Sequence, residues 1–217
     1  KALKIAEKLK KQRKKCKVLL VTHAPFKRMS SRNFLQNLSV NFYDLFVGKP
    51  SINKFDKVIA ITKWEISYLK KLGVKSSKIV YIPNGIPEEF FKLKNQTKEE
   101  NKIIFLGRIA PIKNLEVLIS AIALLKDKNI KLDLVGPAET DYKIKLQKLI
   151  KSLNLESRVI FHKPVYNLKE KIKIIDNHKI FVLSSKSEGM PQSLIEAMAR
   201  AKIVIGNDIP AVRDFLL

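Results

Sequence analysis

The chain has 217 residues and a formal net charge of +23, because 43 Lys and Arg face only 20 Asp and Glu. Hydrophobic residues make up 46% of the sequence, enough to form a core, so a disordered basic tail is excluded. No apolar run approaches the ~20 residues that a membrane-spanning helix needs. The single cysteine, Cys16, excludes an internal disulfide and a cysteine-rich zinc site, and favours a reducing cytosol.

The positive charge is concentrated in the first part of the chain. Residues 1–96 hold 22 Lys and Arg against six Asp and Glu, whereas residues 97–217 hold 21 against 14. Such an excess attracts polyanions, namely nucleic acid, anionic lipid headgroups or phosphorylated substrates. A solvated, lysine-rich surface is the alternative. The chain starts without methionine and without a secretory h-region, and we expect its first residue to be a cut end.

Helices and strands alternate in the first part. Helical spacing of apolar residues predicts helices, and short β-branched runs predict buried strands. The predicted helices are 2–15 and 34–46, and the predicted strands are 17–23, 57–61 and 79–82. Thr62 and Glu65 have the spacing of a capping box, which predicts a helix that starts there and ends at Gly73.

A mostly polar stretch over 88–102 follows, and we place a linker at 94–101. Beyond it, five apolar strands alternate with amphipathic helices, which predicts a parallel sheet of right-handed βαβ units. The strands are expected over 102–106, 131–135, 159–162, 180–184 and 203–205, and the main helices over 115–126, 142–153, 168–175 and 193–200. The predicted fold class is α/β, with two Rossmann-like parallel-sheet domains: an incomplete one over 1–93 and a second over 102–217.

Basic side chains follow the first strand of the second domain. Gly107, Arg108 and Lys113 lie on its carboxyl-end loop, where open parallel sheets bind ligands. Glycine lets the backbone come close to a ligand, and an Arg and a Lys five residues apart can grip phosphate oxygens. A basic pair on the surface of a lysine-rich chain is the alternative.

Two carboxylates accompany a later helix start. Glu188 precedes Gly189 on a loop, Ser193 lies in the first helical turn, and Glu196 follows within the helix. Free amides at the helix start suit a diphosphate, whereas paired carboxylates suit vicinal hydroxyl groups, which donate to them. Together these groups predict a nucleotide-sugar site. In the alternative, Glu188 is only a favourable charge at the helix start and Glu196 lies on a solvated face.

Residues 188–199 resemble the E-x7-E signature of retaining GT-B glycosyltransferases, glycosyltransferase family 4 in particular. Residues 104–113 resemble that family's donor-phosphate loop. Four other segments fit the family in order and spacing: 56–62, 80–85, 134–137 and 158–162. Three positions depart from its pattern: Asn114 stands where the family has Gly, Pro210-Ala211 replaces Gly-Gly, and 200–203 replaces a small-residue–Gly–x–Pro turn. The family's opening strands and terminal helix are missing from the sequence, so we expect a fragment.

The resemblance implies a retaining, metal-independent hexosyltransferase that uses a UDP- or GDP-sugar as substrate and needs no cofactor. It implies catalytic roles for His23, which would face the donor sugar, and for Glu188, which would bind sugar hydroxyls. It assigns the ribose to Glu196, and the departing diphosphate to Arg108 and Lys113. The implied donor-binding set is Gly107, Arg108, Lys113, Gly136, Val165, Glu188, Gly189, Met190, Ser193, Leu194 and Glu196.

The expected partners are a nucleotide-sugar donor, a glycan or lipid acceptor and an anionic membrane surface. The membrane expectation rests on the basic excess of residues 1–96 and on the basic helix 1–15, and we expect the protein in the cytoplasm, peripheral at the inner face of the membrane. No nucleic-acid partner is expected, because no basic stripe is interleaved with aromatic residues. A basic nucleic-acid-binding α/β domain and a non-catalytic donor-binding remnant remain open alternatives. His162 and His178 are expected to be structural.

Overall fold

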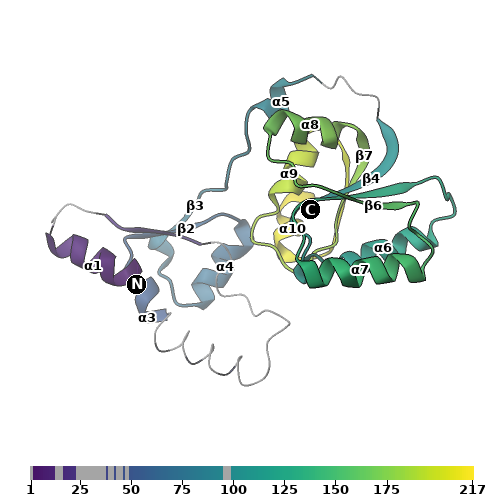
Figure 1. Ribbon diagram of the computed structural model, residues 1–217. Coiled ribbons are helices and arrows are strands. Elements are labelled where there is room, and N and C mark those ends of the chain that lie inside the picture. The colour runs from purple at the N-terminus through teal and green to yellow at the C-terminus, as the bar shows by residue number, and fades with distance from the viewer. Residues whose placement is uncertain are drawn as a thin grey trace. The chain divides into compact units, whose positions relative to one another are not determined.

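The computed structural model describes residues 2–12, 17–22, 38, 42, 46, 49–94 and 99–217. The chain divides into two compact units, Lys1–Asn84 and Gly85–Leu217 (Figure 1). His23 and most of the predicted helix over 34–46 lie outside the described residues.

The first unit contains a small parallel sheet. Its strands are β1 (Leu19–Val21), β2 (Lys57–Ala60) and β3 (Ile79–Tyr81), in the order β1-β2-β3. The helices described here are α1 (Ala2–Gln12), α3 (Lys49–Ile52) and α4 (Lys63–Lys71), with a 3₁₀ turn, η2, at Ser76–Lys78. A cluster of buried side chains joins sheet and helices: Ile52, Val58, Ala60, Leu69 and Val74. The three strands predicted for this part are confirmed.

Of the two hydrogen bonds that the predicted capping box at the start of α4 implies, the one to the Thr62 side chain is not formed. The Thr62 side chain makes no capping hydrogen bond, and its buried hydroxyl has no partner among the described residues. The Glu65 carboxylate does reach back, but it accepts from the Ile61 amide at 2.7 Å and from the Thr22 hydroxyl at 3.2 Å. Glu65 therefore ties the start of α4 to the residue that follows β1.

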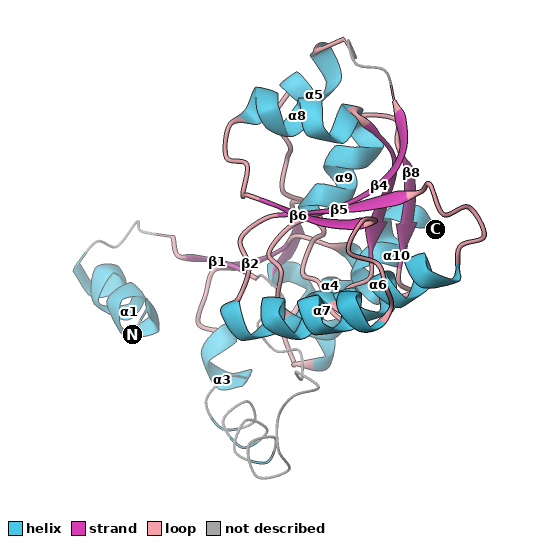
Figure 2. Cartoon of the chain, turned by 45° about the vertical axis from the view of Figure 1, so that its right-hand side comes forward, coloured by secondary structure: helices cyan, strands magenta, loops and turns pink. Residues whose placement is uncertain are grey.

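The second unit is a five-stranded sheet in the order β6-β5-β4-β7-β8, and every neighbouring pair is parallel. The strands are β4 (Glu100–Leu106), β5 (Lys131–Val135), β6 (Val159–His162), β7 (His178–Leu183) and β8 (Ile203–Gly206). The helices are α5 (Glu89–Lys92), α6 (Leu115–Leu124), α7 (Thr140–Ser152), α8 (Leu168–Asp176), α9 (Gln192–Ala199) and α10 (Pro210–Leu216), with η3 at Pro111–Lys113. Helices α6 and α7 cover one face, and α8 and α9 cover the other (Figures 1 and 2). The predicted α/β class with two parallel sheets is confirmed.

The strand order reverses between β4 and β7. The chain runs outward from β4 through β5 to β6, then crosses back to β7 on the other side of β4. At such a switch point the loops after the strands diverge and leave a crevice at their carboxyl ends. The fold therefore provides a ligand site above β4 and its neighbours.

The division between the units lies before the predicted linker at 94–101. Helix α5 belongs to the second unit, because Phe90 is completely buried in its core. Strand β4 begins at Glu100, inside the predicted linker. The polar residues around α5 led to the prediction of a linker. The sequence signal for a segment packed on the core was Phe90.

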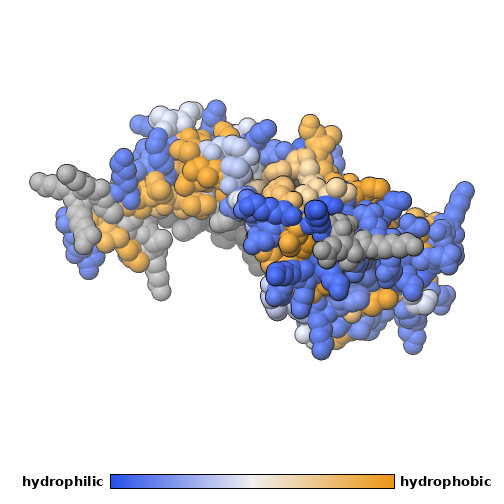
Figure 3. Space-filling view, turned by 90° about the horizontal axis from the view of Figure 1, so that it is seen from above, coloured by the Kyte–Doolittle hydropathy of each residue, from blue (hydrophilic) through white to orange (hydrophobic). Residues whose placement is uncertain are grey.

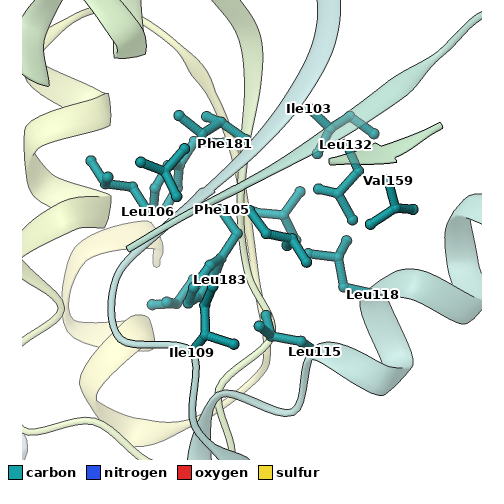
Figure 4. Packing of buried hydrophobic residues seen from close by; sticks show 14 of the residues in the cluster. Ile103, Phe105, Leu106, Ile109, Leu115, Leu118, Leu132, Val159, Phe181 and Leu183 are labelled. Carbon is teal, nitrogen blue, oxygen red and sulfur yellow. The ribbon is translucent and has the colours of Figure 1, made fainter. Parts of the chain in front are cut away.

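Apolar side chains from the strands and from α6 fill the space between sheet and helices (Figure 4). Phe105 and Phe181, from adjacent strands, are fully buried, as is Leu115 at the start of α6. Burial of such side chains contributes ~1.5–3 kcal/mol each. The visible surface is largely hydrophilic with scattered hydrophobic patches (Figure 3).

Candidate functional site

A pocket of about 340 Å³ lies in the second unit at the carboxyl ends of β4, β5, β6 and β7. It is lined by Leu106, Gly107, Arg108, Lys113, Val135, Gly136, Pro137, Pro164, Val165, Tyr166, Lys171, Glu188, Met190, Pro191, Gln192 and Ser193. Its walls thus come from four strand-end loops and from the first turns of α8 and α9. This is the crevice expected from the strand order.

Two glycines form the floor between β4 and β5. Gly136 has φ +145°, and a Cβ atom on it would come within 2.0 Å of the Gly107 carbonyl oxygen. The Gly107 amide donates to the Val135 carbonyl at 3.0 Å, which holds the two loops together. Glycine at position 136 is therefore required by the close approach of the loops, independently of any ligand.

Lys113 and Glu188 form an ion pair across the pocket. The Lys113 Nζ donates to Glu188 Oε1 at 2.6 Å, and both side chains are mostly buried. The Ser184 hydroxyl donates to the Lys113 carbonyl at 2.9 Å, which joins the β4 loop to the end of β7. The expected phosphate-binding cation and the expected sugar-binding carboxylate therefore contact each other.

Arg108 lies at the edge of the same pocket. Its guanidinium donates to Glu139 Oε1 at 2.9 Å, and both side chains are largely exposed. An exposed pair of this kind contributes ~0–1 kcal/mol, so the guanidinium exchanges readily to another anion.

Lys171 and Glu196 form a second ion pair between α8 and α9. The Lys171 Nζ donates to Glu196 Oε1 at 2.5 Å, and the exposed fractions of the two side chains are 27% and 7%. Glu196 Oε2 is buried and has no partner in the part of the chain that the structure describes.

Eight of the predicted donor-binding residues line the pocket: Gly107, Arg108, Lys113, Gly136, Val165, Glu188, Met190 and Ser193. Glu196 and Gly189 are not part of the lining, but Glu196 is hydrogen-bonded to Lys171, which is. Leu194 is fully buried in the core, and its amide donates to the Pro191 carbonyl at 3.1 Å. His23 lies outside the described residues.

Eight of the 16 lining residues are outside the predicted donor-binding set, and Tyr166 and Lys171 are among them. Tyr166, 85% exposed, directly follows the predicted Val165, and Lys171 lies in the first turns of α8. The sequence signal for Tyr166 was its position after a strand. Lys171 gave no distinct signal, because lysines recur along this helix.

Two of the departures from the family pattern adopt glycine-like backbone conformations. Asn114 has φ 53° and Ala201 has φ 53°, both in the left-handed region. Asparagine tolerates this region, so Asn114 fulfils the role of the usual glycine. Alanine does not have a polar side chain that compensates, so the turn at Ala201 is strained.

Both remaining histidines face one aspartate. His178 Nε2 lies 2.8 Å from Asp133 Oδ2, and its Nδ1 lies 2.7 Å from the Ile174 carbonyl oxygen. His162 Nε2 lies 3.0 Å from Asp133 Oδ1 without the alignment of a hydrogen bond. Burial raises the pKa of Asp133, but the contacts with the two histidines outweigh it and lower the pKa overall. None of the three lines the pocket.

Among the described residues, no three His, Cys, Asp or Glu side chains are placed to hold a metal ion, and metal independence stays a prediction. None of the helices in the described ranges is both long enough and apolar enough to cross a bilayer.

The chain belongs to the glycosyl transferases group 1 family. That family's model matches residues 86–216, and the model of glycosyltransferase family 4 matches residues 3–90. The resemblance to GT-B enzymes of family 4 is therefore confirmed.

Related proteins include the capsular polysaccharide biosynthesis glycosyltransferase CapH of Staphylococcus aureus, 32% identical over 142 residues, which are 64% of this chain and 38% of CapH. An uncharacterized glycosyltransferase of Methanocaldococcus jannaschii is 29% identical over 204 residues, or 89% of this chain and 51% of that protein. The chain thus spans at most about half of these relatives. The structure of Anabaena HepE in complex with UDP-glucose matches with a TM-score of 0.80 at 20% identity, covering 100% of this chain and 60% of HepE.

Proposed function

We propose that the protein transfers a sugar from a nucleoside-diphosphate sugar to a glycan or lipid acceptor, and that the second unit, which contains the predicted donor domain 102–217, binds the donor. The observation that carries this proposal is the convergence of Arg108, Lys113 and Glu188 on one pocket at the strand switch point. Two cations beside a carboxylate match a ligand that joins phosphate oxygens to sugar hydroxyls.

The charges of the pocket favour cleavage of the donor. When the bond between the anomeric carbon and the β-phosphate oxygen breaks, the oxygen keeps the electron pair. Arg108 and Lys113 stabilise this developing charge, which is usually the largest catalytic contribution. The acceptor oxygen bonds to the anomeric carbon, and its proton passes to the departing phosphate.

We further propose that the anomeric configuration is retained, that His23 and Glu188 contact the reacting sugar, and that no metal is required. These points rest on family membership together with the cations already present. NMR of the product anomer tests retention, and activity that persists in excess EDTA tests metal independence. An inverted product or a loss of turnover on chelation would refute the respective point.

The donor is tested by thermal-shift screening of the intact protein against UDP-, GDP- and ADP-sugars. A donor at ~100 times its dissociation constant adds ~2.7 kcal/mol to the stability of the folded state. Lys113→Met should abolish this shift. Lys92→Met is the matched control, because Lys92 pairs with Glu88 on the exposed surface of the same unit. Absence of any nucleotide-sugar shift, together with tight and salt-sensitive RNA binding, would contradict the proposal and favour the nucleic-acid alternative.

A membrane-proximal acceptor is also proposed, from helix α1. Ile5 and Leu9 of this basic helix are 60% and 43% exposed, so apolar side chains accompany the lysines at the surface. Such a helix binds anionic interfaces through burial of its apolar side chains and through electrostatic attraction of its lysines. Flotation with vesicles that contain phosphatidylglycerol should recover the protein at low salt, and binding that is equal on neutral vesicles would exclude this acceptor surface.

A further inference from the structure

The Lys171–Glu196 pair is incompletely satisfied. An ionised carboxylate offers about four acceptor positions, and a buried one is stable only when its oxygens are paired. Glu196 receives one bond from Lys171 at 2.5 Å, and its Oε2 has no partner among the described side chains and amides. A buried carboxylate oxygen without a partner beside a pocket indicates either that a ligand bonds to it or that Lys171 alone must neutralise the carboxylate.

Lys171 separates Glu196 from the pocket. Lys171 lines the pocket beside Val165 and Tyr166, whereas Glu196 lies behind it and is not part of the lining. The ammonium is also 5.8 Å from the centroid of the buried Phe90 ring, a distance at which a cation is attracted to the ring face. Two groups therefore hold the Lys171 ammonium, and its single hydrogen bond leaves N–H donors for a ligand in the pocket that it lines.

The position of Lys171 along the pocket fits the nucleoside. The cations Arg108 and Lys113 come from the loop after β4, whereas Val165 and Tyr166 come from the loop after β6, two strands away in the sheet. Two strand spacings are about 10 Å. This is the scale of the offset between a diphosphate and the nucleoside attached to it, and the exposed Tyr166 ring offers an apolar face at that end.

We propose that Lys171 is a nucleoside-contacting residue of the donor pocket and that Glu196 acts through it as a positioning residue. The proposal rests on the proposed donor site. An ammonium has three N–H donors, so one bond to Glu196 leaves donors for a ribose oxygen or for a carbonyl oxygen of the base. Glu196 Oε1 then orients this donor, and Oε2 stays available to the ribose that the family resemblance assigns to Glu196.

The test is titration calorimetry of the intact protein with UDP, GDP and inorganic pyrophosphate, which lacks the nucleoside. Lys171→Met should weaken the tighter of the two nucleotides roughly tenfold to a hundredfold, as expected for loss of a charge-assisted hydrogen bond. Pyrophosphate affinity should be unchanged, whereas Lys113→Met should weaken all three ligands. Lys169→Met is the matched control, because Lys169 is an exposed lysine of the same helix.

Lys171→Met leaves the Glu196 charge without its lysine, so the double variant Lys171→Met/Glu196→Gln separates contact from neutralisation. A direct contact predicts weaker nucleotide binding in the double variant than in Glu196→Gln alone. Equal affinity of these two variants, or equal losses for nucleotide and pyrophosphate in Lys171→Met, overturns the inference alone. Wild-type protein that binds none of the three ligands overturns the proposed donor site, and this inference with it.

Discussion

Helices α8 and α9 are joined by one buried and one partly buried ion pair, which differ in how completely they are satisfied. At one end, Arg200 donates to both oxygens of Asp176, at 2.8 and 2.7 Å, and to the carbonyl oxygens of Phe90 and Leu93, at 2.9 and 2.6 Å. At the other end, Glu196 accepts one bond from Lys171. The first pair uses four guanidinium bonds within the protein, whereas the second leaves hydrogen-bonding capacity unused.

This difference separates a structural pair from the pair that we propose to act in ligand binding. A buried charge stabilises a fold only when its hydrogen-bonding groups are satisfied, and the Arg200 cluster meets this condition. It also ties α5 to the body of the second unit, since Phe90 and Leu93 belong to that segment. The Lys171–Glu196 pair lies beside the pocket and is incomplete without a further partner. Unused hydrogen-bonding capacity, rather than charge, therefore distinguishes the end that lies beside the pocket.

The largest expected effect comes from Arg200→Ala. Removal of one partner from a buried pair leaves an uncompensated charge and typically costs 3–5 kcal/mol. We expect the free energy of unfolding to fall by about this amount in chemical denaturation. Nucleotide affinity, measured under conditions where the variant remains folded, should change little.

Arg213→Ala is the control for Arg200→Ala. Arg213 also forms a two-pronged pair with an aspartate, Asp208, but both side chains are exposed. Its loss should leave the denaturation midpoint almost unchanged, because surface pairs contribute little. Similar losses in both variants would show that burial and satisfaction do not distinguish these pairs.

Glu196→Gln should have the opposite profile. A glutamine oxygen still accepts from Lys171, and the substitution removes a buried charge, so the free energy of unfolding should change by less than about 1 kcal/mol. Nucleotide affinity should fall about tenfold, because the ammonium is held less firmly. Calorimetry and denaturation of the same preparation measure both quantities. A loss of stability comparable to that of Arg200→Ala would make Glu196 a structural residue.

Ala201→Gly should stabilise the protein by about 0.5–1 kcal/mol. Ala201 follows α9 with φ 53°, a conformation that is unfavourable for alanine and favoured by a glycine after a helix. The gain is limited by the greater freedom of glycine in the unfolded chain. Thermal unfolding measures it, and Asn154→Gly, at φ 54°, is the control that should gain less because asparagine tolerates this region. An unchanged or lower midpoint for Ala201→Gly would contradict the strain at this turn.

The sequence was most informative where apolar patterning decides the structure. Strands β5 and β6 have the predicted bounds, because short, mostly apolar runs flanked by polar residues leave little ambiguity. The charged motifs also led to one pocket, where Arg108, Lys113 and Glu188 converge.

Partner choice among like-charged side chains could not be predicted. Lys169, Lys171 and Lys173 all lie on α8, and only the packing of α8 against α9 selects Lys171 for Glu196. Likewise, the role of Arg200 depends on the fold of α5, whose four residues are too few for periodicity to predict a helix. The ion-pair partners of long side chains such as Lys and Arg depend on tertiary packing. The spacing of apolar residues in the sequence does not specify them.

The smallest expected effect concerns Asp133, whose pKa is lowered in the folded protein. A carboxyl with a depressed folded-state pKa contributes stability that is complete above its unfolded value of about 3.9 and is lost as the pH falls through the folded-state pKa. Asp133→Asn should therefore lower the free energy of unfolding near neutral pH. The difference from wild type should shrink as the pH falls from about 4 through the lowered folded-state pKa, because the carboxyl is protonated first in the unfolded chain and then in the folded protein.

Asp208→Asn provides the control for Asp133, since Arg213 lowers the pKa of the exposed Asp208 as well. At about 1 M salt, screening should remove the pH-dependent difference for Asp208 but not for Asp133, which is buried against His178 and His162. Denaturation series at two salt concentrations measure this. If salt also removed the pH-dependent difference in unfolding free energy for Asp133→Asn, the contacts of Asp133 would be exposed to solvent. Asp133 would then resemble the exposed Arg213 pair and not the buried Arg200 pair.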